Sequence, residues 1–501
     1  MRTGVRQAQT RFSDYSAFLP YRTIEDYGAF EEGQTDRSWR SAVPSLKEIQ
    51  LMAHLKIGQG YNVPIKGQAK KETVDVGPAP FVGVCPSSFE HVKPKLHVAV
   101  NDEVVAGEVL FHDKANPNLV FVAPASGRIT AINYGARRAI DSIVIATSET
   151  PQYRQHDAYD LEALAEFSRD ALIKHLMAGG IWPFIKQRPF NHIANPERKP
   201  KSIFINCMDS APLANDPNYS LKDRADWFEA GCEAMKILAD GKVHVVTDAK
   251  GAFDGFTKPR GVIYHTALGK HPVGLVGTHI ARIDPINRGQ CVWHIHARDL
   301  VLLGGFLLSG QIQTERIVAI AGPGTTTPRY VRSQIGAQIS HLVQNTLAEG
   351  EQRVISGNVL TGTQTSTEGF LGYYDDLVTL VPEGREQRFL GWIMPALNMP
   401  SFTRALPTGF FPGKKFPMNT NINGGHRAII QSLAYDRVVA LDVHPEFLIK
   451  AAMAQDIDAM EKLGILECDP EDFALCSYVC PSKTEVTSVI KAGLELMEKE
   501  G

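Results

Sequence analysis

Between Leu55 and Thr147, glycines divide the chain into short runs in which apolar and polar residues alternate. Successive side chains of a strand point to opposite faces, so a period of two indicates half-buried β-strands. The clearest run extends from Lys95 to Phe111, where Val98 and Val100 alternate before two turns. A second strand-turn-strand unit is expected at Ala123–Ile129. Helices cannot be built from runs this short, so the segment is predicted to be an all-β domain.

This pattern resembles the small β sandwich of lipoyl and biotinyl carrier domains. Such domains carry a modified lysine on a hairpin tip, and Lys114 lies in the triplet Asp113–Ala115 seen in lipoylated domains. The following Asn116–Asn118 segment favours a turn of its own, which lengthens the tip and misdirects the lysine. Lys114 is therefore interpreted as a solvated surface residue, with a lipoyl-type carrier as the alternative.

Beyond residue 150 the period changes to an alternation of strands and helices. Apolar residues recur at helical spacing between Leu161 and Leu176, and an amphipathic helix is predicted over Asp226–Leu238. Buried strands are predicted at Ser202–Asn206, Val243–Thr247 and Val262–His265. Strands that alternate with helices are typical of a parallel sheet, so this region is predicted to be Rossmann-like.

A compact mixed unit is expected next. Arg316–Ala321 and Arg353–Ser356 read as strands, Gly322–Gly324 as a turn and Ser333–Leu347 as a helix, which is compatible with a β-grasp (SLBB-like) fold. The last part of the chain ends in helical repeats of apolar residues. The predicted fold class is thus multidomain α/β and α+β, in the following ranges: an N-terminal extension at 1–50, the sandwich at 51–150, the Rossmann-like domain at 151–310, the β-grasp domain at 311–380 and a helical C-terminal domain with a degenerate cysteine motif at 381–501.

Composition excludes several classes of protein. The net charge of −3 gives no basic field, so nucleic acid is not expected as a partner. The longest apolar run, Leu300–Leu308, is about half the length that a membrane-spanning helix needs. Seven cysteines in 501 residues fit free thiols in a reduced cytoplasm better than a disulfide framework. Residues 1–50 have little periodicity, and two interpretations stay open: a segment that wraps a neighbour, or partial disorder.

Two loops were candidates for phosphate binding. The loop Asn206–Pro212 follows a predicted strand but has no glycine, and its Asp209 would repel a pyrophosphate. The segment Gly322–Pro328 lacks the Gly-Lys-Ser/Thr ending of a P-loop. Neither loop is predicted to bind a nucleotide.

Four residues have a metal-like arrangement. His279, Cys291, His294 and His296 lie in one stretch, and the last two would share one face of a strand. A zinc site could use such ligands. Half-buried, hydrogen-bonded histidines are the commoner outcome, and this interpretation is preferred.

The C-terminal cysteines resemble a broken cluster motif. Cys476 and Cys480, with Pro481, match the end of a Cys-x2-Cys-x2-Cys-x3-Cys-Pro run, but Phe473 and Pro470 occupy the two earlier ligand positions. Cys468 lies outside that register. A four-iron cluster is therefore not expected.

Local motifs for catalysis are missing as well. The sequence has no Gly-x-Ser-x-Gly elbow and no His-Glu-x-x-His, and the adjacent Asp375 and Asp376 are interpreted as a solvated turn rather than an acid/base pair. We assign no catalytic, cofactor-binding or metal-ligating residue to this chain.

The ordered set of domains and motifs resembles NqrA, the A subunit of the sodium-translocating NADH:quinone reductase, over about residues 51–501. The motifs that carry this resemblance are Leu55–Gly67, Ala123–Gly127, Gly277–Ile280, Val292–Ile295, Val354–Gly357, Val359–Gly362, Asn423–Arg427 and Glu471–Pro481. A more distant similarity is to the C subunit of the Rnf electron-transfer complex (RnfC) and to the flavin-binding NADH subunit of respiratory complex I. Those relatives use a glycine-rich loop for flavin and NADH.

The corresponding slot here looks like Met177–Pro183, where Ile181 and Trp182 occupy space that a flavin or phosphate would need. This departure favours the sodium-pump component, with an RnfC-like flavin- and NADH-binding electron carrier as the alternative.

The resemblance implies a peripheral subunit on the cytoplasmic face of the inner membrane, in a complex that couples NADH oxidation and quinone reduction to Na⁺ export. NADH, flavins, iron-sulfur and quinone chemistry would lie in other subunits. This chain would scaffold them, the membrane-embedded B subunit especially, and could contribute to quinone access. The Pro/Phe-rich stretch Phe389–Phe416, with Trp392, Phe410 and Phe411, is the candidate contact surface, with a packed connector as the alternative.

Overall fold

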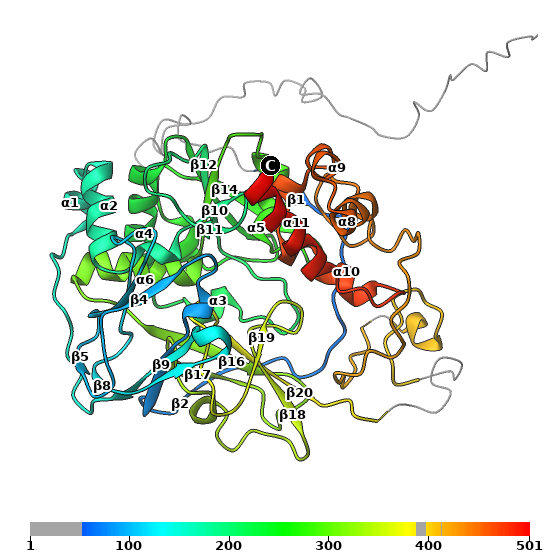
Figure 1. Ribbon diagram of the computed structural model, residues 1–501, viewed down its shortest axis with the longest axis horizontal. Helices are drawn as coiled ribbons and strands as arrows, with labels where there is room; N and C mark the ends of the chain where they lie inside the picture. Colours follow the sequence, from blue (N-terminus) through cyan, green and yellow to red (C-terminus); the bar gives the residue numbers. More distant parts are fainter. Residues whose placement is uncertain (1–52, 387–396, 412) are drawn as a thin grey trace, which may run out of the picture. The chain divides into compact units, whose positions relative to one another are not determined.

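The computed structural model describes residues 53–386, 397–411 and 413–501. The N-terminal extension therefore lies outside the described residues, and so does Trp392. The described residues belong to a unit that begins at Gln50, and their strands form four sheets (Figure 1).

The largest sheet is Rossmann-like. Its strand order is β1-β14-β13-β12-β15-β10-β11, in which the first five strands run parallel and the last two antiparallel. The bounds are β1 (Ala53–Lys56), β14 (Ile263–Leu268), β13 (Lys242–Asp248), β12 (Ser202–Asn206), β15 (Val292–His296), β10 (Lys186–Arg188) and β11 (His192–Ile193). The three strands predicted from apolar runs are confirmed as β12, β13 and β14.

Helices cover this sheet. They are α1 (Leu161–Ala165), α2 (Arg169–Ala178), α3 (Pro217–Ser220), α4 (Ala225–Leu238), α5 (Val276–Ile283) and α6 (Ala297–Ser309). The predicted amphipathic helix is confirmed as α4, with Cys232, Met235 and Leu238 fully buried. Its period-3.6 apolar stripe packs against α6, which contains the longest apolar run of the chain.

The sandwich consists of two small sheets. Their orders are β3-β9-β8-β5 and β4-β6-β7. The bounds are β3 (Phe81–Val84), β4 (Pro94–Leu96), β5 (Glu103–Val104), β6 (Val109–Asp113), β7 (Val120–Val122), β8 (Gly127–Tyr134) and β9 (Ile140–Thr147). Alternation along these strands buries residues such as Ile129, Ile143 and Ile145 between the sheets.

The β-grasp unit is a six-stranded sheet in the order β19-β18-β20-β16-β17-β2. Its elements are β2 (Lys70–Asp75), β16 (Glu315–Ala321), β17 (Arg329–Gln334), α7 (Ile339–Leu342), β18 (Gln352–Ser356), β19 (Thr363–Thr365) and β20 (Leu377–Pro382). The helix predicted over Ser333–Leu347 is wrong. Ser333 pairs with Arg316 in β17, Gly336 takes a positive φ of 72°, and only one helical turn follows.

The pairing of strands crosses the sequence ranges. Although β1 and β2 both precede the sandwich in sequence, β1 pairs with β14 of the Rossmann-like sheet and β2 pairs with β17 of the β-grasp sheet. The N-terminal part of the described chain therefore links all three units.

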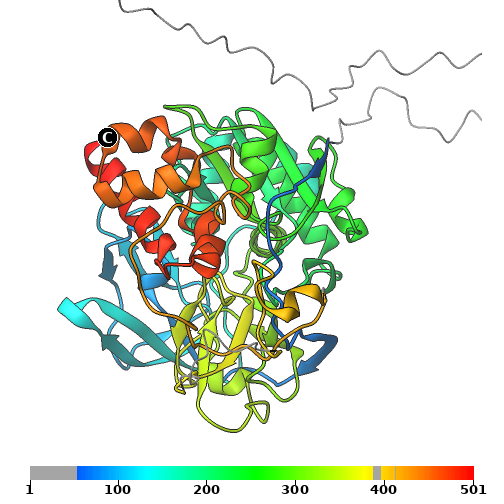
Figure 2. The ribbon, with the colours of Figure 1, turned by 90° about the vertical axis from the view of Figure 1, so that its right-hand side faces the viewer.

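The chain ends in helices, as predicted. They are α8 (Pro445–Ala454), α9 (Ile457–Lys462), α10 (Ala474–Val479) and α11 (Val486–Glu500), with the 3₁₀ turn η8 (Pro470–Phe473) before α10. Figure 2 shows them gathered in one group. Among the described residues, no helix is long and apolar enough to cross a membrane.

Candidate functional site

A cavity of about 760 Å³ lies at the carboxyl ends of β12 and β13. Open parallel sheets usually bind their ligands at this edge. The loop Asn206–Pro212 forms one wall, and the side chains of Lys71, Lys250, Lys414 and Lys415 also line it. This edge is the first place to test for nucleotide chemistry.

The loop itself is bonded to the protein. Asn206 Nδ2 donates to the carbonyl of Gly274 at 2.8 Å, and Ser210 Oγ accepts from the Gly274 amide at 2.8 Å. The amide of Ala211 donates to Asp209 Oδ1. Burial raises the pKa of Asp209 to about 6, so at neutral pH this carboxylate is mostly ionised and would repel a phosphate.

The glycines of the segment Gly322–Pro328 have a packing role. Gly322 has a φ of 110°, and a Cβ atom there would lie 2.1 Å from the carbonyl oxygen of Leu380. Its amide donates to the carbonyl of Gly67. These residues let β16 turn toward β17 against neighbouring backbone, which explains glycine here without a bound phosphate.

The slot Met177–Pro183 is filled by the protein's own side chains. Ile181 and Trp182 are fully buried, and Trp182 Nε1 donates to the carbonyl of Ala194 at 2.7 Å. Gly179 packs against the ring of Phe306 and Gly180 against Val122, both so closely that a Cβ atom would clash. The glycine pair thus serves the contact between α2, α6 and the sandwich.

The four metal-like residues of the sequence do not meet as one group. His279 Nε2 bonds to the carbonyl of Val273 at 2.8 Å, and Cys291 Sγ points to the carbonyl of Lys199. His294 and His296 lie on one face of β15 with their rings 6.5 Å apart, and His294 Nε2 lies 3.1 Å from Asn191 Oδ1. Burial lowers the pKa of both histidines.

The three C-terminal cysteines are buried free thiols. Cys480 Sγ lies 3.0 Å from the hydroxyl of Tyr435 and accepts from the amide of Thr484 at 3.2 Å. Burial raises the pKa of Cys480, but these hydrogen bonds outweigh it and the pKa is lowered. Burial raises the pKa of Cys468 and Cys476 well above the usual range, which favours the thiol form there.

Lys114 is exposed at the end of β6, and its amide donates to the carbonyl of Lys93. The turn predicted at Asn116–Asn118 is present, with Asn116 Oδ1 accepting from the amide of Asn118. The tip is therefore longer than a two-residue hairpin.

Where the Rossmann-like sheet, the β-grasp unit and the C-terminal helices meet, the structure contains a buried ionic network that the sequence did not predict. Arg188, on β10, contacts Asp469 at 2.8 Å and Glu471 at 2.7 Å, and its side chain is 3% exposed. Arg298 Nη1, at the start of α6, bonds to Asp376 Oδ1 at 3.1 Å. Arg316 of β16 pairs with Asp299. The network joins all three parts of the chain.

The interpretation of Asp375 and Asp376 as a solvated turn is wrong. Asp376 is buried against Arg298, and Asp375 Oδ2 accepts from Ser356 Oγ at 2.6 Å. Burial raises the pKa of Asp375. Both carboxylates face the interior because the chain enters β20 between two other sheets, which two adjacent acidic residues cannot reveal.

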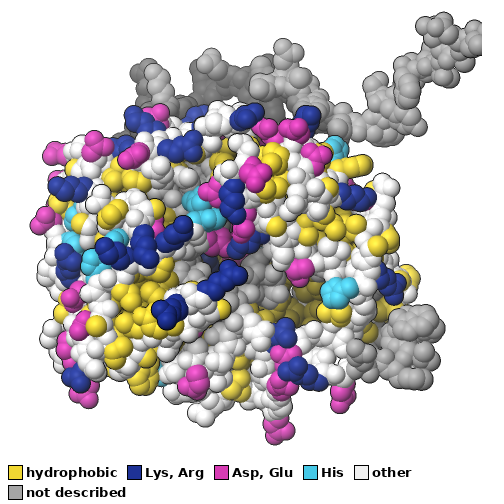
Figure 3. All heavy atoms as spheres, in the orientation of Figure 1, with side chains coloured by type: hydrophobic (Ala, Val, Ile, Leu, Met, Phe, Trp, Pro, Cys, Tyr) yellow, Lys and Arg dark blue, Asp and Glu magenta, His cyan; other side chains and the backbone are white. Residues whose placement is uncertain are grey.

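Beside this network lies a second cavity of about 520 Å³. Lys186 reaches into it with its Nζ atom 4.1 Å from the ring centre of Tyr374, and burial lowers the pKa of this lysine. Figure 3 shows basic, acidic and histidine side chains around a hollow near the middle of one face. The hydroxyl of Tyr374 donates to the carbonyl of Pro183, so the wall of the cavity connects the β-grasp unit to the filled slot.

Comparison with known proteins explains this architecture. Three family models match in chain order: the NqrA N-terminal barrel-sandwich hybrid domain at residues 55–148, the NqrA second alpha/beta domain at 167–312 and the NQRA C-terminal domain at 317–367. The A subunits of the Na(+)-translocating NADH-quinone reductase from Histophilus somni (strain 129Pt) and Yersinia pestis are 38% and 39% identical to this chain. Each alignment covers 89% of this chain and 100% of the relative. The chain belongs to the NqrA family of Na(+)-translocating NADH-quinone reductase subunits.

Membership in the NqrA family confirms the resemblance inferred from the ordered motifs and the predicted fold class. It is a family named for one subunit of an enzyme complex. A solved NAD⁺-reducing [NiFe]-hydrogenase in its H₂-reduced state aligns with 71% of this chain and 67% of that chain at 11% identity, with a TM-score of 0.35. A likeness at that level carries no argument about function.

Proposed function

We propose that this chain is a peripheral structural subunit of a Na⁺-translocating NADH:quinone reductase, on the cytoplasmic face of the membrane and without a redox centre of its own. The observation that carries the proposal is the filled slot at Ile181 and Trp182, together with the buried network around Arg188. The first leaves no room for a flavin where the distant relatives bind one, and the second holds three units in one geometry.

Exposed apolar side chains support contact with other subunits. Leu397, Phe410 and Phe411 are 63%, 73% and 61% exposed. They belong to the described part of the contact surface expected at 389–416, and large exposed apolar side chains are typical of interaction sites. The membrane-embedded B subunit is the proposed partner, and any role in quinone access would rest on the same surface.

The cofactor part of the proposal is tested on the purified full chain. Its visible spectrum, flavin content and iron content are measured before and after addition of NADH. We expect substoichiometric flavin and iron and no spectral change with NADH. Stoichiometric flavin that NADH bleaches would overturn this part and support the electron-carrier alternative.

The scaffold part is tested by co-purification of the complex. Phe410→Ser with Phe411→Ser is expected to lower the yield of membrane subunits captured by this chain. The control is Tyr134→Ser, since Tyr134 is an aromatic residue of β8 that is 59% exposed far from this segment in the sequence. Equal capture by both variants would show that the complex does not use this surface.

A further inference from the structure

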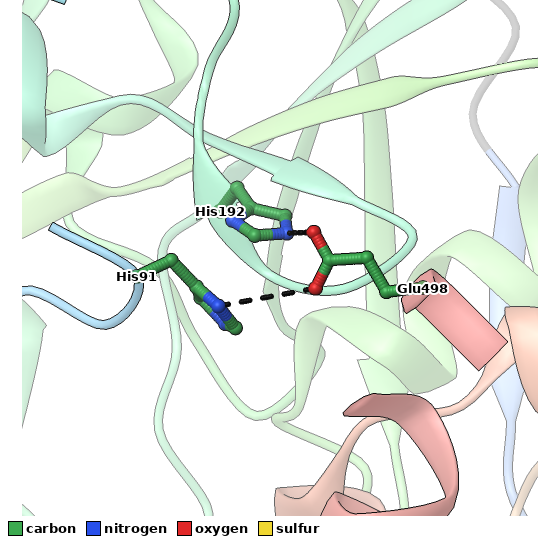
Figure 4. A group of neighbouring side chains, drawn as sticks. All are labelled: His91, His192 and Glu498. Atoms are coloured by element: carbon green, nitrogen blue, oxygen red, sulfur yellow. Dashed lines mark ion pairs between the residues drawn. The ribbon is translucent and has the colours of Figure 1, made fainter. Parts of the chain in front are cut away.

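Three potential metal ligands from three separate units meet beside the 520 Å³ cavity. His91 follows the 3₁₀ turn η2 (Pro86–Ser88) in the sandwich, and His192 begins β11 at the edge of the Rossmann-like sheet. Glu498 lies in the last turn of α11. Figure 4 shows the two imidazoles on either side of the carboxylate. One nitrogen of each ring and a carboxylate oxygen all lie within 4.8 Å of one another.

The separations suit a small ion. His192 Nε2 lies 2.8 Å from Glu498 Oε1, and His91 Nδ1 lies 3.8 Å from Glu498 Oε2. Ligand bonds of about 2.0–2.1 Å in a tetrahedral site place neighbouring ligand atoms about 3.3 Å apart. The observed distances fall on both sides of that value. The side chains are 34%, 21% and 36% exposed, so small rotations can equalise them without disturbing the core.

We propose that His91, His192 and Glu498 form a binding site for a divalent transition-metal ion of the zinc class. Two imidazole nitrogens and one carboxylate oxygen suit Zn²⁺, Co²⁺ or Ni²⁺, whereas Mg²⁺ and Ca²⁺ prefer oxygen ligands alone. A three-ligand set leaves one position for water. The site goes beyond the proposed function and does not depend on it.

The surrounding charges favour a cation. Glu90 and Glu495 line the same cavity as His91 and Glu498, and Glu90 is paired with Lys491 at 2.6 Å. Burial lowers the pKa of His192 below its usual value. At neutral pH this imidazole is therefore uncharged and can bind an ion without first releasing a proton.

The proposed ion would tie the C-terminal helix to the body of the protein. His91, His192 and Glu498 belong to segments that are more than 100 residues apart in sequence. An ion that binds only the folded arrangement stabilises that arrangement by mass action. The metal would thus act as a clip between α11, β11 and the sandwich.

The test uses the full chain after dialysis against a chelator. Titration with Zn²⁺ by calorimetry is expected to give one ion per chain with micromolar affinity, and excess Mg²⁺ should not compete. Co²⁺ should give a visible absorption band, which reports coordination directly. Zn²⁺ should also raise the midpoint of thermal unfolding by several degrees.

Glu498→Gln and His192→Ala are each expected to weaken Zn²⁺ binding at least tenfold and to abolish the Co²⁺ band. The matched control is His97→Ala. His97 Nε2 lies beside His112 Nδ1, a histidine pair that no carboxylate completes in the described part of the chain. Circular dichroism checks that each variant is folded, and His192→Gln replaces His192→Ala if the latter is not. Unchanged Zn²⁺ affinity in a folded Glu498→Gln chain, or loss of binding in His97→Ala alone, would overturn the proposal.

Discussion

Arg188 Nη2 donates to Glu471 Oε1 at 2.7 Å across 283 residues of sequence. The same guanidinium contacts Asp469, so one buried arginine holds the turn η8 against the edge of the Rossmann-like sheet. Carboxylates left without their partner in a buried site are costly. This relationship identifies Arg188 as the residue on which the contact between the sheet and the C-terminal helices depends most.

Replacement of Arg188 by Met should therefore destabilise the chain by about 3–5 kcal/mol, because it leaves buried carboxylates unpaired. The free energy of unfolding in urea measures the effect. Arg128→Met is the control, since the pair of Arg128 with Glu103 is more than half exposed. That variant should change the stability by less than about 1 kcal/mol. Equal effects of the two substitutions would contradict the role given to the network.

Asp209 should make the chain less stable as the pH rises. Burial raises the pKa of this carboxyl from 3.8 to about 6, so the folded state holds the proton more tightly than the unfolded state. Its contribution to stability is present below pH about 4 and is lost as the pH rises through about 6. Asp209→Asn should raise the free energy of unfolding at pH 7.5 by about 1–2 kcal/mol, because the side chain is only partly buried. A variant that is less stable than wild type at pH 7.5 would contradict this account.

His279 should have the opposite dependence. Burial lowers its pKa to about 4, so the folded state favours the neutral ring. Stability from this residue is present above pH about 6.5 and is lost as the pH falls through about 4. His279→Gln retains a donor near the carbonyl of Val273 and should reduce the loss of stability between pH 6.5 and 4 by about 2 kcal/mol. His54→Gln, at an exposed position of β1, is the control and should leave the acid limb of the unfolding curve unchanged.

Gly304 should not tolerate a side chain. A Cβ atom there would lie 1.8 Å from the carbonyl oxygen of Trp227, so α4 and α6 could no longer approach as closely. Gly304→Ala is expected to lower the free energy of unfolding by at least about 2 kcal/mol despite the higher helix propensity of alanine. Gly58→Ala, at a glycine with open space around its Cα atom, should have a small effect. Thermal and urea unfolding of both variants test the difference.

Local pattern was sufficient for much of the fold. The apolar runs of β12 and β13, the amphipathic stripe of α4 and the helices after residue 440 are visible in the sequence because each repeats the period of its own element. The family could also be recognised, since the order of several short motifs is far more specific than any one of them.

Pairing between distant segments was decided only in three dimensions. The strands β1 and β2 join sheets whose other members lie far along the chain, and the segment predicted as a helix at Ser333 instead completes β17. Strand pairing outweighs local helix propensity there, because each ladder bond satisfies a backbone group that would otherwise be buried alone.

The sequence alone determined which elements form and which family they belong to, because periodicity and motif order are local and cumulative properties. Only the tertiary structure decided that Asp376 is buried beside Arg298 and that His91, His192 and Glu498 converge. Charge, burial and ligand geometry depend on neighbours supplied by other units, and no spacing along one segment encodes those neighbours.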